Sequence, residues 1–493
     1  MATNTWARRL VTASGWAAAL RSTPAVLAGG SLGLFVLAFA LYWPYLNDSF
    51  ALDDYIWLQA ASNPHPADFF RRAFSFPPST LFNSATPFWR PAVDTYFFAA
   101  WRTYHLHAAP YHVTNVAVHA ANACLLAILV WQTTSSRVSG LLTAVLFVVL
   151  PTYDFAVTWI SSITELLGTF FYLLTMTLYA AFLRRPAQAR WLYGGAFAVL
   201  LLALLTKESV VTLPLALSGL VVAIDPPRSR LALRRSMLEL TPFVALMLAY
   251  FVFLYVQEYR AGDDDGLYRF GWHGFENLWE YLRWIALPLP DDFAAWVGPA
   301  RPWAGAAFIG LGCAALLLRS RPLGLPFVWV MAGLLPYSFF PAGIEWRYTY
   351  LASVPFAVFA VGVLGLALKP LAIRAGPPAA TAALAAVVIA GSVFSAGQAR
   401  DRQEMLAVQA TAYEALFVQV PEVCGPLPRG SHIFVVSSPI FDLFGASSRM
   451  ALNMHYDDVH VALGGLPDLV DFIESKCIVQ YDWAAGGYLR VER

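Results

Sequence analysis

The sequence has very little charge for its length. Only 13% of its 493 residues are Asp, Glu, Lys or Arg, whereas soluble domains carry about 25%. Hydrophobic residues make up 58% of the chain, so a soluble protein of this size would have too little polar surface to cover its core. The composition therefore excludes an ordinary soluble protein and predicts that apolar side chains face lipid.

Excess charge of either sign is also missing. The formal net charge is +1, and lysine occurs only as Lys207, Lys369 and Lys476. A nucleic-acid partner normally requires a strong basic field, so no nucleic-acid partner is expected. The preference for Arg over Lys suggests a GC-rich bacterial source.

Cysteine is scarce and lacks the spacing of a metal site. The four cysteines include no CxxC pair, and two of them lie inside apolar runs. This pattern argues against a zinc site or a dense disulfide framework. Cys424 and Cys477 both fall in the polar C-terminal segment, where they can pair if that segment lies in an oxidising compartment.

Long apolar runs dominate the rest of the chain. A membrane-spanning helix needs about 20 apolar residues, and the first run has this length without a small-residue cleavage site after it, so it predicts a helix and no cleaved signal. We expect about eleven membrane helices from the runs at 25–46, 111–131, 139–158, 163–183, 191–206, 208–225, 239–258, 303–318, 325–341, 348–367 and 379–396.

The positions of the basic residues predict the orientation. If the N-terminus is cytoplasmic, every short basic loop falls on the cytoplasmic side, as the positive-inside rule requires. The residues concerned are Arg8, Arg9, Arg21, Arg137, Arg184, Arg185, Arg190, Arg228, Arg230, Arg234, Arg235, Arg319, Arg321, Lys369 and Arg374. We therefore expect a multi-pass inner-membrane protein with residues 1–24 in the cytoplasm and a membrane domain over 25–396. Two external loops, about 47–110 and 260–302, and residues 397–493 would lie outside.

The C-terminal segment changes character. Apolar stretches such as HIFVVSS and VHVAL are separated by Pro, Gly and Asp turns, which predicts a small α/β domain. No internal repeat of the kind found in TPR arrays is visible. The predicted fold is thus a mostly α, polytopic helix bundle with a small extracytoplasmic α/β domain.

An acidic pair follows the first apolar run. Asp53 and Asp54 lie in FALDDYIWL, between apolar and aromatic residues. Such a pair can supply a general base or hold a divalent cation, Mg²⁺ or Mn²⁺, near a phosphate leaving group. The alternative is a solvated loop end, where adjacent acids are common.

Two further motifs place charge at the predicted outer interface. Lys207 and Glu208 interrupt two apolar runs, and this lysine lies against the positive-inside trend. Glu345, Arg347 and Tyr348 lie at the start of the tenth run. Lys and Arg can bind phosphate; the alternatives are a tight interfacial turn for the first motif and an ion pair within an aromatic belt for the second.

Polar residues also occur within the helices and the second external loop. Asn115, His119 and Asn122 share one helical stripe, which favours hydrogen bonds between helices over catalysis. In the loop at 260–302, Asp263, Asp264 and Asp265 precede the aromatic and histidine residues Tyr268, Trp272, His273 and Trp279. These residues can line a groove for an acceptor or a sugar, or form an acidic turn before an amphipathic helix at the membrane surface.

Five blocks in order carry a family resemblance. They are FALDDYIWL, FWRPAVDTYFFAAWRTYHLHAAPYHVTNVAVHAANACLLAILV, AVTWISSITELLGTFFYLLTMTLY, LLTKESVVTLPLAL and EWRYTYLASVPFAV, within residues 30 to 365. Together they resemble the GT-C superfamily of polyprenyl-phosphate-sugar-dependent glycosyltransferases. The likeness is greatest to the membrane part of the transmembrane-and-TPR O-mannosyltransferases and their bacterial relatives. It is more distant to protein O-mannosyltransferases and lipid A aminoarabinose transferases.

The resemblance implies a function and roles for individual residues. Asp53 or Asp54 would be the base or a metal ligand in an inverting displacement, and Lys207 and Arg347 would bind the donor phosphate. Arg90 and Glu165 fall in matching blocks and would have supporting roles. From their motifs, Glu208, Glu345, Tyr348 and His119 are further candidates for supporting residues. The expected partners are a polyprenyl-phosphate-sugar donor, a protein, glycan or lipid acceptor, and membrane lipids. The absence of TPR repeats leaves the acceptor open.

Other classes of membrane protein are weighed against the transferase. A secondary transporter would show inverted repeats and charged or broken helices near the midplane, whereas here the charges gather at one interface. A flippase for lipid-linked substrates, or a non-catalytic protein of envelope assembly, would use similar polar clusters to hold headgroups. Turnover of a lipid-linked donor separates these two alternatives from the transferase.

Overall fold

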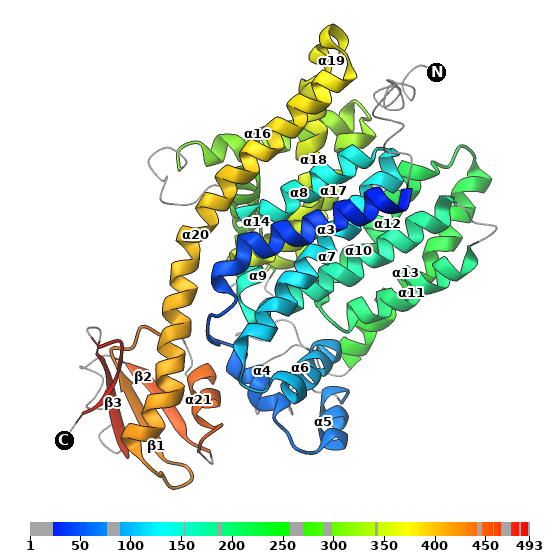
Figure 1. Ribbon diagram of the computed structural model, residues 1–493. Helices are drawn as coiled ribbons and strands as arrows, with labels where there is room; N and C mark the ends of the chain where they lie inside the picture. Colours follow the sequence, from blue (N-terminus) through cyan, green and yellow to red (C-terminus); the bar gives the residue numbers. More distant parts are fainter. Residues whose placement is uncertain are drawn as a thin grey trace. The chain divides into compact units, whose positions relative to one another are not determined.

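The computed structural model describes residues 23–75, 89–151, 154–184, 189–256, 270–288, 298–340, 344–440, 446–456, 458–464, 475–482 and 485–491. The chain divides into two compact units (Figure 1). The first contains residues up to Trp43, Val116–Ala156 and Thr164–Arg400. The second contains Pro44–Asn115, Val157–Ile163 and the chain from Asp401 onward. The second unit therefore combines the first predicted external loop with the C-terminal segment.

Apolar helices build the first unit. They are α3 (Thr23–Tyr42), most of α7 (Ala108–Thr134), α8 (Arg137–Val149), α10 (Ile163–Arg184), α11 (Arg190–Leu204), η5 (Glu208–Thr212), α12 (Leu213–Ile224), α13 (Arg230–Val256), α14 (His273–Ala286), α16 (Arg301–Leu317), α17 (Arg321–Ser338), η7 (Trp346–Thr349), α18 (Tyr350–Ala367), α19 (Lys369–Ala375) and the start of α20 (Pro377–Cys424). Every apolar run predicted from the sequence overlaps at least one of these helices.

The helices present apolar side chains outward, as a membrane protein requires. Val36 of α3 is 62% exposed and Val252 of α13 is 60% exposed. Within the described residues, five helices are long and apolar enough to cross a membrane, and five apolar helices are shorter. The structure thus confirms a mostly helical membrane protein. The total of eleven spans and the orientation of the termini stay predictions, and Arg8, Arg9, Arg21 and Arg185 lie outside the described residues.

Small residues let neighbouring helices of this unit approach closely. A Cβ atom added at Gly140 of α8 would lie 2.4 Å from the carbonyl oxygen of Ala127 in α7. At Gly333 of α17 it would meet the backbone of Ala352 in α18 at 3.4 Å. Helices in membranes associate through such close packing, so Gly140 in particular has no room for a side chain.

Short helices and a sheet build the second unit. The helices are η1 (Trp43–Tyr45, partly), α4 (Asp54–Ala61), α5 (Pro66–Ala73), α6 (Pro91–Tyr104), α9 (Asp154–Thr158, partly), η4 (Ile160–Ser162), the end of α20 and α21 (Ala446–Leu452). The predicted run at 139–158 is therefore split between α8 and α9. Helix α20 has 48 residues, so it continues well past residue 396, where the predicted run ended.

A four-stranded sheet confirms the predicted C-terminal α/β character. The strands are β1 (His432–Val436), β2 (His460–Gly464), β3 (Cys477–Asp482) and β4 (Gly487–Arg490), in the order β2-β1-β3-β4. β1 pairs in parallel with β2 and β3, and β3 pairs antiparallel with β4. Phe434, Val436 and Ile478 form its core. The predicted stretches HIFVVSS and VHVAL supply β1 and β2.

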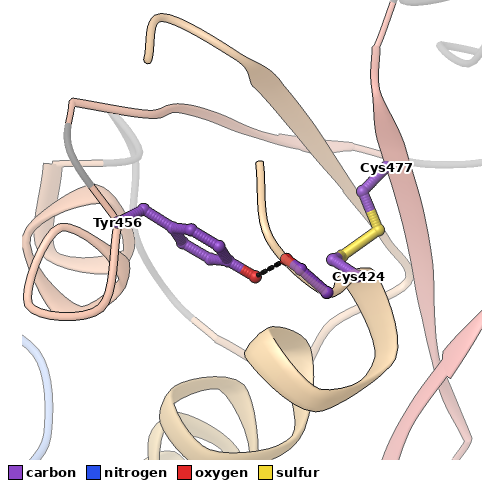
Figure 2. The surroundings of a disulfide bond; sticks show 4 residues. Cys424, Tyr456 and Cys477 are labelled. Carbon is purple, nitrogen blue, oxygen red and sulfur yellow. Dashed lines mark hydrogen bonds between the residues drawn. A yellow bond between two sulfur atoms is a disulfide. The ribbon is translucent and has the colours of Figure 1, made fainter. Parts of the chain in front are cut away.

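The cysteine pairing allowed by the sequence is present. Cys424, at the end of α20, forms a disulfide with Cys477, the first residue of β3, with the Cα atoms 5.8 Å apart. Figure 2 shows the bond together with Tyr456, whose hydroxyl donates to the carbonyl of Gly425 at 3.0 Å. The disulfide therefore ties helix α20 to the sheet.

Candidate functional site

The acidic pair sits in a tightly held turn of the second unit. Asp54 is the first residue of α4 and is 1% exposed. One carboxylate oxygen accepts the backbone N–H of Ala51 at 2.9 Å. The other accepts the N–H of Ser161 at 2.8 Å and its hydroxyl at 2.5 Å. We call residues Ala51–Asp54 the acidic turn.

The two aspartates of the acidic turn have different surroundings. Burial raises the pKa of Asp54 to about 7, although its three hydrogen bonds oppose the shift. Asp53 is only partly buried. Both oxygens of Asp54 accept hydrogen bonds that stabilise the turn. Asp54 is therefore a structural residue, whereas the carboxylate of Asp53 is more accessible. The sequence pattern did not distinguish them.

A second chain segment closes on the acidic turn. Ser161 belongs to η4, and Trp159 just before it donates its indole N–H to the carbonyl of Ala51 at 3.2 Å. Asn115 binds this segment in turn, donating to the carbonyl oxygens of Val157 at 3.3 Å and Trp159 at 2.9 Å. Ser161 and Trp159 carry no signal in the sequence, because only folding brings them to the acidic pair.

A second buried carboxyl that no sequence motif marks lies in α6. Asp94 is 5% exposed, and burial raises its pKa to about 8, while the positive charge of Arg90 lowers it. Arg90 is the N-cap residue of α6, four residues before Asp94. Arg90, which was predicted to have a supporting role, therefore interacts electrostatically with the carboxyl of Asp94.

Two motifs predicted to carry charge converge with Glu165 in the first unit. Lys207 and Glu165 form a buried ion pair, and the hydroxyl of Tyr337 donates to the other Glu165 oxygen at 2.9 Å. Tyr337 stacks on Tyr348 with the ring centroids 4.6 Å apart. The ammonium of Lys207 lies 5.5 Å from the centroids of both rings.

Arg347, from the same motif as Tyr348, also belongs to this cluster. Its guanidinium lies 5.1 Å from the ring centroid of Tyr348 and forms an ion pair with Glu345. The side chains of Arg347 and Glu345 are 17% and 50% exposed. We call residues Glu165, Lys207, Tyr337, Glu345, Arg347 and Tyr348 the charged cluster. It is most buried at Lys207 and Glu165 and most exposed at Glu345, with Arg347 partly exposed.

The remaining predicted residues are placed as follows. Glu208 begins η5 directly after Lys207 and is partly buried. His119 is fully buried, with its ring nitrogens 2.8 Å from the hydroxyl of Tyr350 and 3.3 Å from the carbonyl of Val148. Asn122 donates to the carbonyl of Leu166 and to the hydroxyl of Tyr350, each at 3.0 Å. These bonds confirm that the polar stripe of α7 forms hydrogen bonds between helices.

The second predicted external loop is only partly described. Asp263, Asp264, Asp265 and Tyr268 lie outside the described residues. Trp272 is exposed, whereas Trp279 packs beside Gly305 where α14 meets α16. Helix α14 packs against α16 and α17, and thus forms part of the helix bundle.

The described residues offer a poor site for a divalent cation. They contain no group of three His, Cys, Asp or Glu side chains arranged to hold a metal ion. Both oxygens of Asp54 accept hydrogen bonds from N–H and O–H groups, which occupy the positions that a cation would need. The Mg²⁺ or Mn²⁺ predicted at Asp53 and Asp54 stays a prediction.

Comparison with known proteins finds likeness in structure only. No family model and no curated protein matches the sequence. A solved oligosaccharyltransferase from Archaeoglobus fulgidus, tethered to an acceptor peptide containing the NVT sequon, is similar with 11% identity and a TM-score of 0.50. The match covers 88% of this chain and 64% of the archaeal chain.

Structures of ArnT from Cupriavidus metallidurans are similar over 92% of this chain and 93% of theirs. The apo form has 13% identity and the form bound to undecaprenyl phosphate 14%, each with a TM-score of 0.49. At such identities the likeness concerns the fold. The match to the archaeal oligosaccharyltransferase shows that this chain shares the fold of that protein.

Proposed function

We propose that the protein is a membrane glycosyltransferase that moves a sugar from a polyprenyl-phosphate-linked donor to an acceptor hydroxyl at the outer membrane face. The observation that carries this proposal is the charged cluster, in which two motifs far apart in sequence place Lys207 and Arg347 around the ring of Tyr348. The GT-C fold supports the same reading. The acceptor is a protein, a glycan or a lipid.

Asp53 is the proposed general base. It takes the proton from the acceptor hydroxyl while the hydroxyl oxygen attacks the anomeric carbon of the sugar. The bond between that carbon and the phosphate oxygen breaks, the phosphate leaves with the electron pair, and the configuration inverts. Asp54 does not take this role, because its oxygens are committed to Ala51 and Ser161.

Arg347 is the proposed donor-phosphate ligand. Guanidinium groups bind phosphate through two parallel hydrogen bonds, and Arg347 is the more accessible cation of the charged cluster. Lys207 is 5% exposed and paired with Glu165, so its proposed role is to hold Tyr337 and Tyr348 in place beside Arg347. The resemblance implied that Lys207 binds the donor phosphate directly, whereas here only Arg347 is proposed to do so.

The experiment is sugar transfer by the purified full-length chain in lipid, with a panel of radiolabelled polyprenyl-phosphate sugars and crude envelope acceptors. We expect the wild type to release polyprenyl phosphate and Asp53→Asn to lose at least ~100-fold in rate without a change in melting temperature. Asp68→Asn, at an exposed ion pair in the same unit, is the matched control and should behave as wild type.

The remaining variants test the other assignments. Asp54→Asn should lose both activity and thermal stability, because three hydrogen bonds depend on its carboxylate. Arg347→Lys keeps the charge but not the paired hydrogen bonds, and should raise KM for the donor about tenfold. If no donor is consumed, or if all variants match wild type, the transferase proposal fails and a flippase or a non-catalytic envelope protein takes its place. If the wild type consumes donor and Asp53→Asn alone matches it, the assignment of Asp53 as the base fails.

A further inference from the structure

The C-terminal segment contacts the acidic turn directly within the second unit. Helix α21 packs against α4, and the hydroxyl of Ser447 lies 3.5 Å from a carboxylate oxygen of Asp53, to which it donates. Ser447 is 5% exposed. The two residues are 394 positions apart in the chain, so the contact exists only in the folded protein.

Helix α20 also contacts residues on both sides of the acidic turn. Tyr55, next to Asp54, stacks on Tyr413 with the ring centroids 5.6 Å apart, and its ring lies 5.5 Å from that of Phe417. Just before the turn, Ser49 donates its hydroxyl to Glu414 at 2.5 Å. Residues from the C-terminal segment therefore hold the acidic turn both before and after the aspartates.

The position of α21 depends on the sheet. The helix connects the parallel neighbours β1 and β2. Arg449 donates to Asp458 at 2.9 Å, and Asn453 accepts the backbone N–H of Val459 at 2.8 Å, directly before β2. The first bond ties α21 itself, and the second ties the residue that follows it, to the chain just before β2. The position of Ser447 therefore depends on the sheet.

We propose that Ser447 is a positioning residue for the base. This inference rests on the proposed function, in which Asp53 accepts the proton of the acceptor hydroxyl. A carboxylate on a partly exposed turn rotates about its side-chain bonds, and a donated hydrogen bond to one oxygen restricts that rotation. Restricting it keeps the carboxylate at the geometry needed for proton transfer. On this reading, the C-terminal segment completes the catalytic machinery of the second unit.

The test compares Ser447→Thr with Ser447→Val in the donor-release assay. Threonine and valine have nearly the same shape, so a difference between these variants reports the hydroxyl alone. We expect Ser447→Val to lower kcat about three- to tenfold with an unchanged KM for the donor, and Ser447→Thr to stay within about twofold of wild type. Ser438→Ala removes a hydroxyl that bonds Tyr488 in the same unit at 2.6 Å and is the control.

The outcomes distinguish a failure of the Ser447 role from a failure of the proposed transferase function. Equal kcat for the threonine and valine variants, or a loss in Ser438→Ala as large as that in Ser447→Val, would overturn the positioning role while leaving Asp53 as the base. A rise in KM without a fall in kcat would also overturn it, because positioning acts on the chemical step. Loss of the proposed function itself is recognised separately, by a wild type that consumes no donor, and loss of the base assignment by an active Asp53→Asn.

Discussion

The buried ion pair of Lys207 and Glu165 offers a quantitative test of the charged cluster. Their side chains are 6% and 2% exposed, so replacing Lys207 with Met leaves a buried carboxylate whose described hydrogen bond comes from the Tyr337 hydroxyl. Removing one partner of a buried pair costs about 3–5 kcal/mol, whereas replacing both partners is often neutral. We therefore expect Lys207→Met to be strongly destabilised and the double variant Lys207→Met/Glu165→Gln to recover most of the loss.

The assay is thermal unfolding of the protein in lipid, followed by the donor-release measurement. The exposed pair of Arg235 and Glu239, in which the arginine side chain is 70% exposed, is the matched control and should contribute under about 0.5 kcal/mol. A Lys207→Met variant as stable as wild type would refute the reasoning. A double variant that is stable and still binds donor as wild type would show that donor binding does not need Lys207.

Two further predictions concern the second unit. Cys424→Ser, or reduction of the disulfide, should destabilise this unit by about 4 kcal/mol, which is the chain-entropy value for the 53-residue separation of Cys424 and Cys477. Cys313→Ser removes a free cysteine and should melt at the wild-type temperature. Equal melting temperatures for the two variants would contradict the prediction. For Asp94, the pKa raised to about 8 means that the folded protein holds this proton more tightly than the unfolded chain. The contribution of this proton to the free energy of unfolding is complete below about pH 4. It falls by up to ~1.4 kcal/mol for each pH unit as the pH rises to about 8. Melting temperature measured across this range should therefore fall less steeply for Asp94→Asn than for wild type, and parallel slopes would show that Asp94 carries no such proton.

Much of the fold follows from patterns that extend over a single helix or strand. The apolar run at 111–131 predicts most of α7, because burial in lipid depends on the average composition of about 20 neighbouring residues. The polar stripe at Asn115, His119 and Asn122 predicts hydrogen bonds between helices for a similar reason, since the helical period places these side chains on one face. The pattern of strands and turns likewise predicted the small C-terminal α/β domain.

The candidate site was predictable in its residue types but not in its arrangement. The sequence placed Asp53, Asp54, Lys207 and Arg347 among the residues of interest, yet it treated the two aspartates as equivalent and both cations as phosphate ligands. The structure shows Asp54 bound to Ser161 and Lys207 bound to Glu165. Which charges are already neutralised depends on side chains from other segments, and no local pattern contains that information.

The sequence by itself determined that the chain enters a membrane, where its helices lie and that it ends in a small α/β segment, because these properties depend on hydropathy and period over short windows. Only the tertiary structure decided which residues meet. The ring of Tyr348 lies near both Lys207 and Arg347, and Ser447 meets Asp53 across 394 positions. Such contacts are set by how helices and the sheet pack, and packing depends on the whole chain at once.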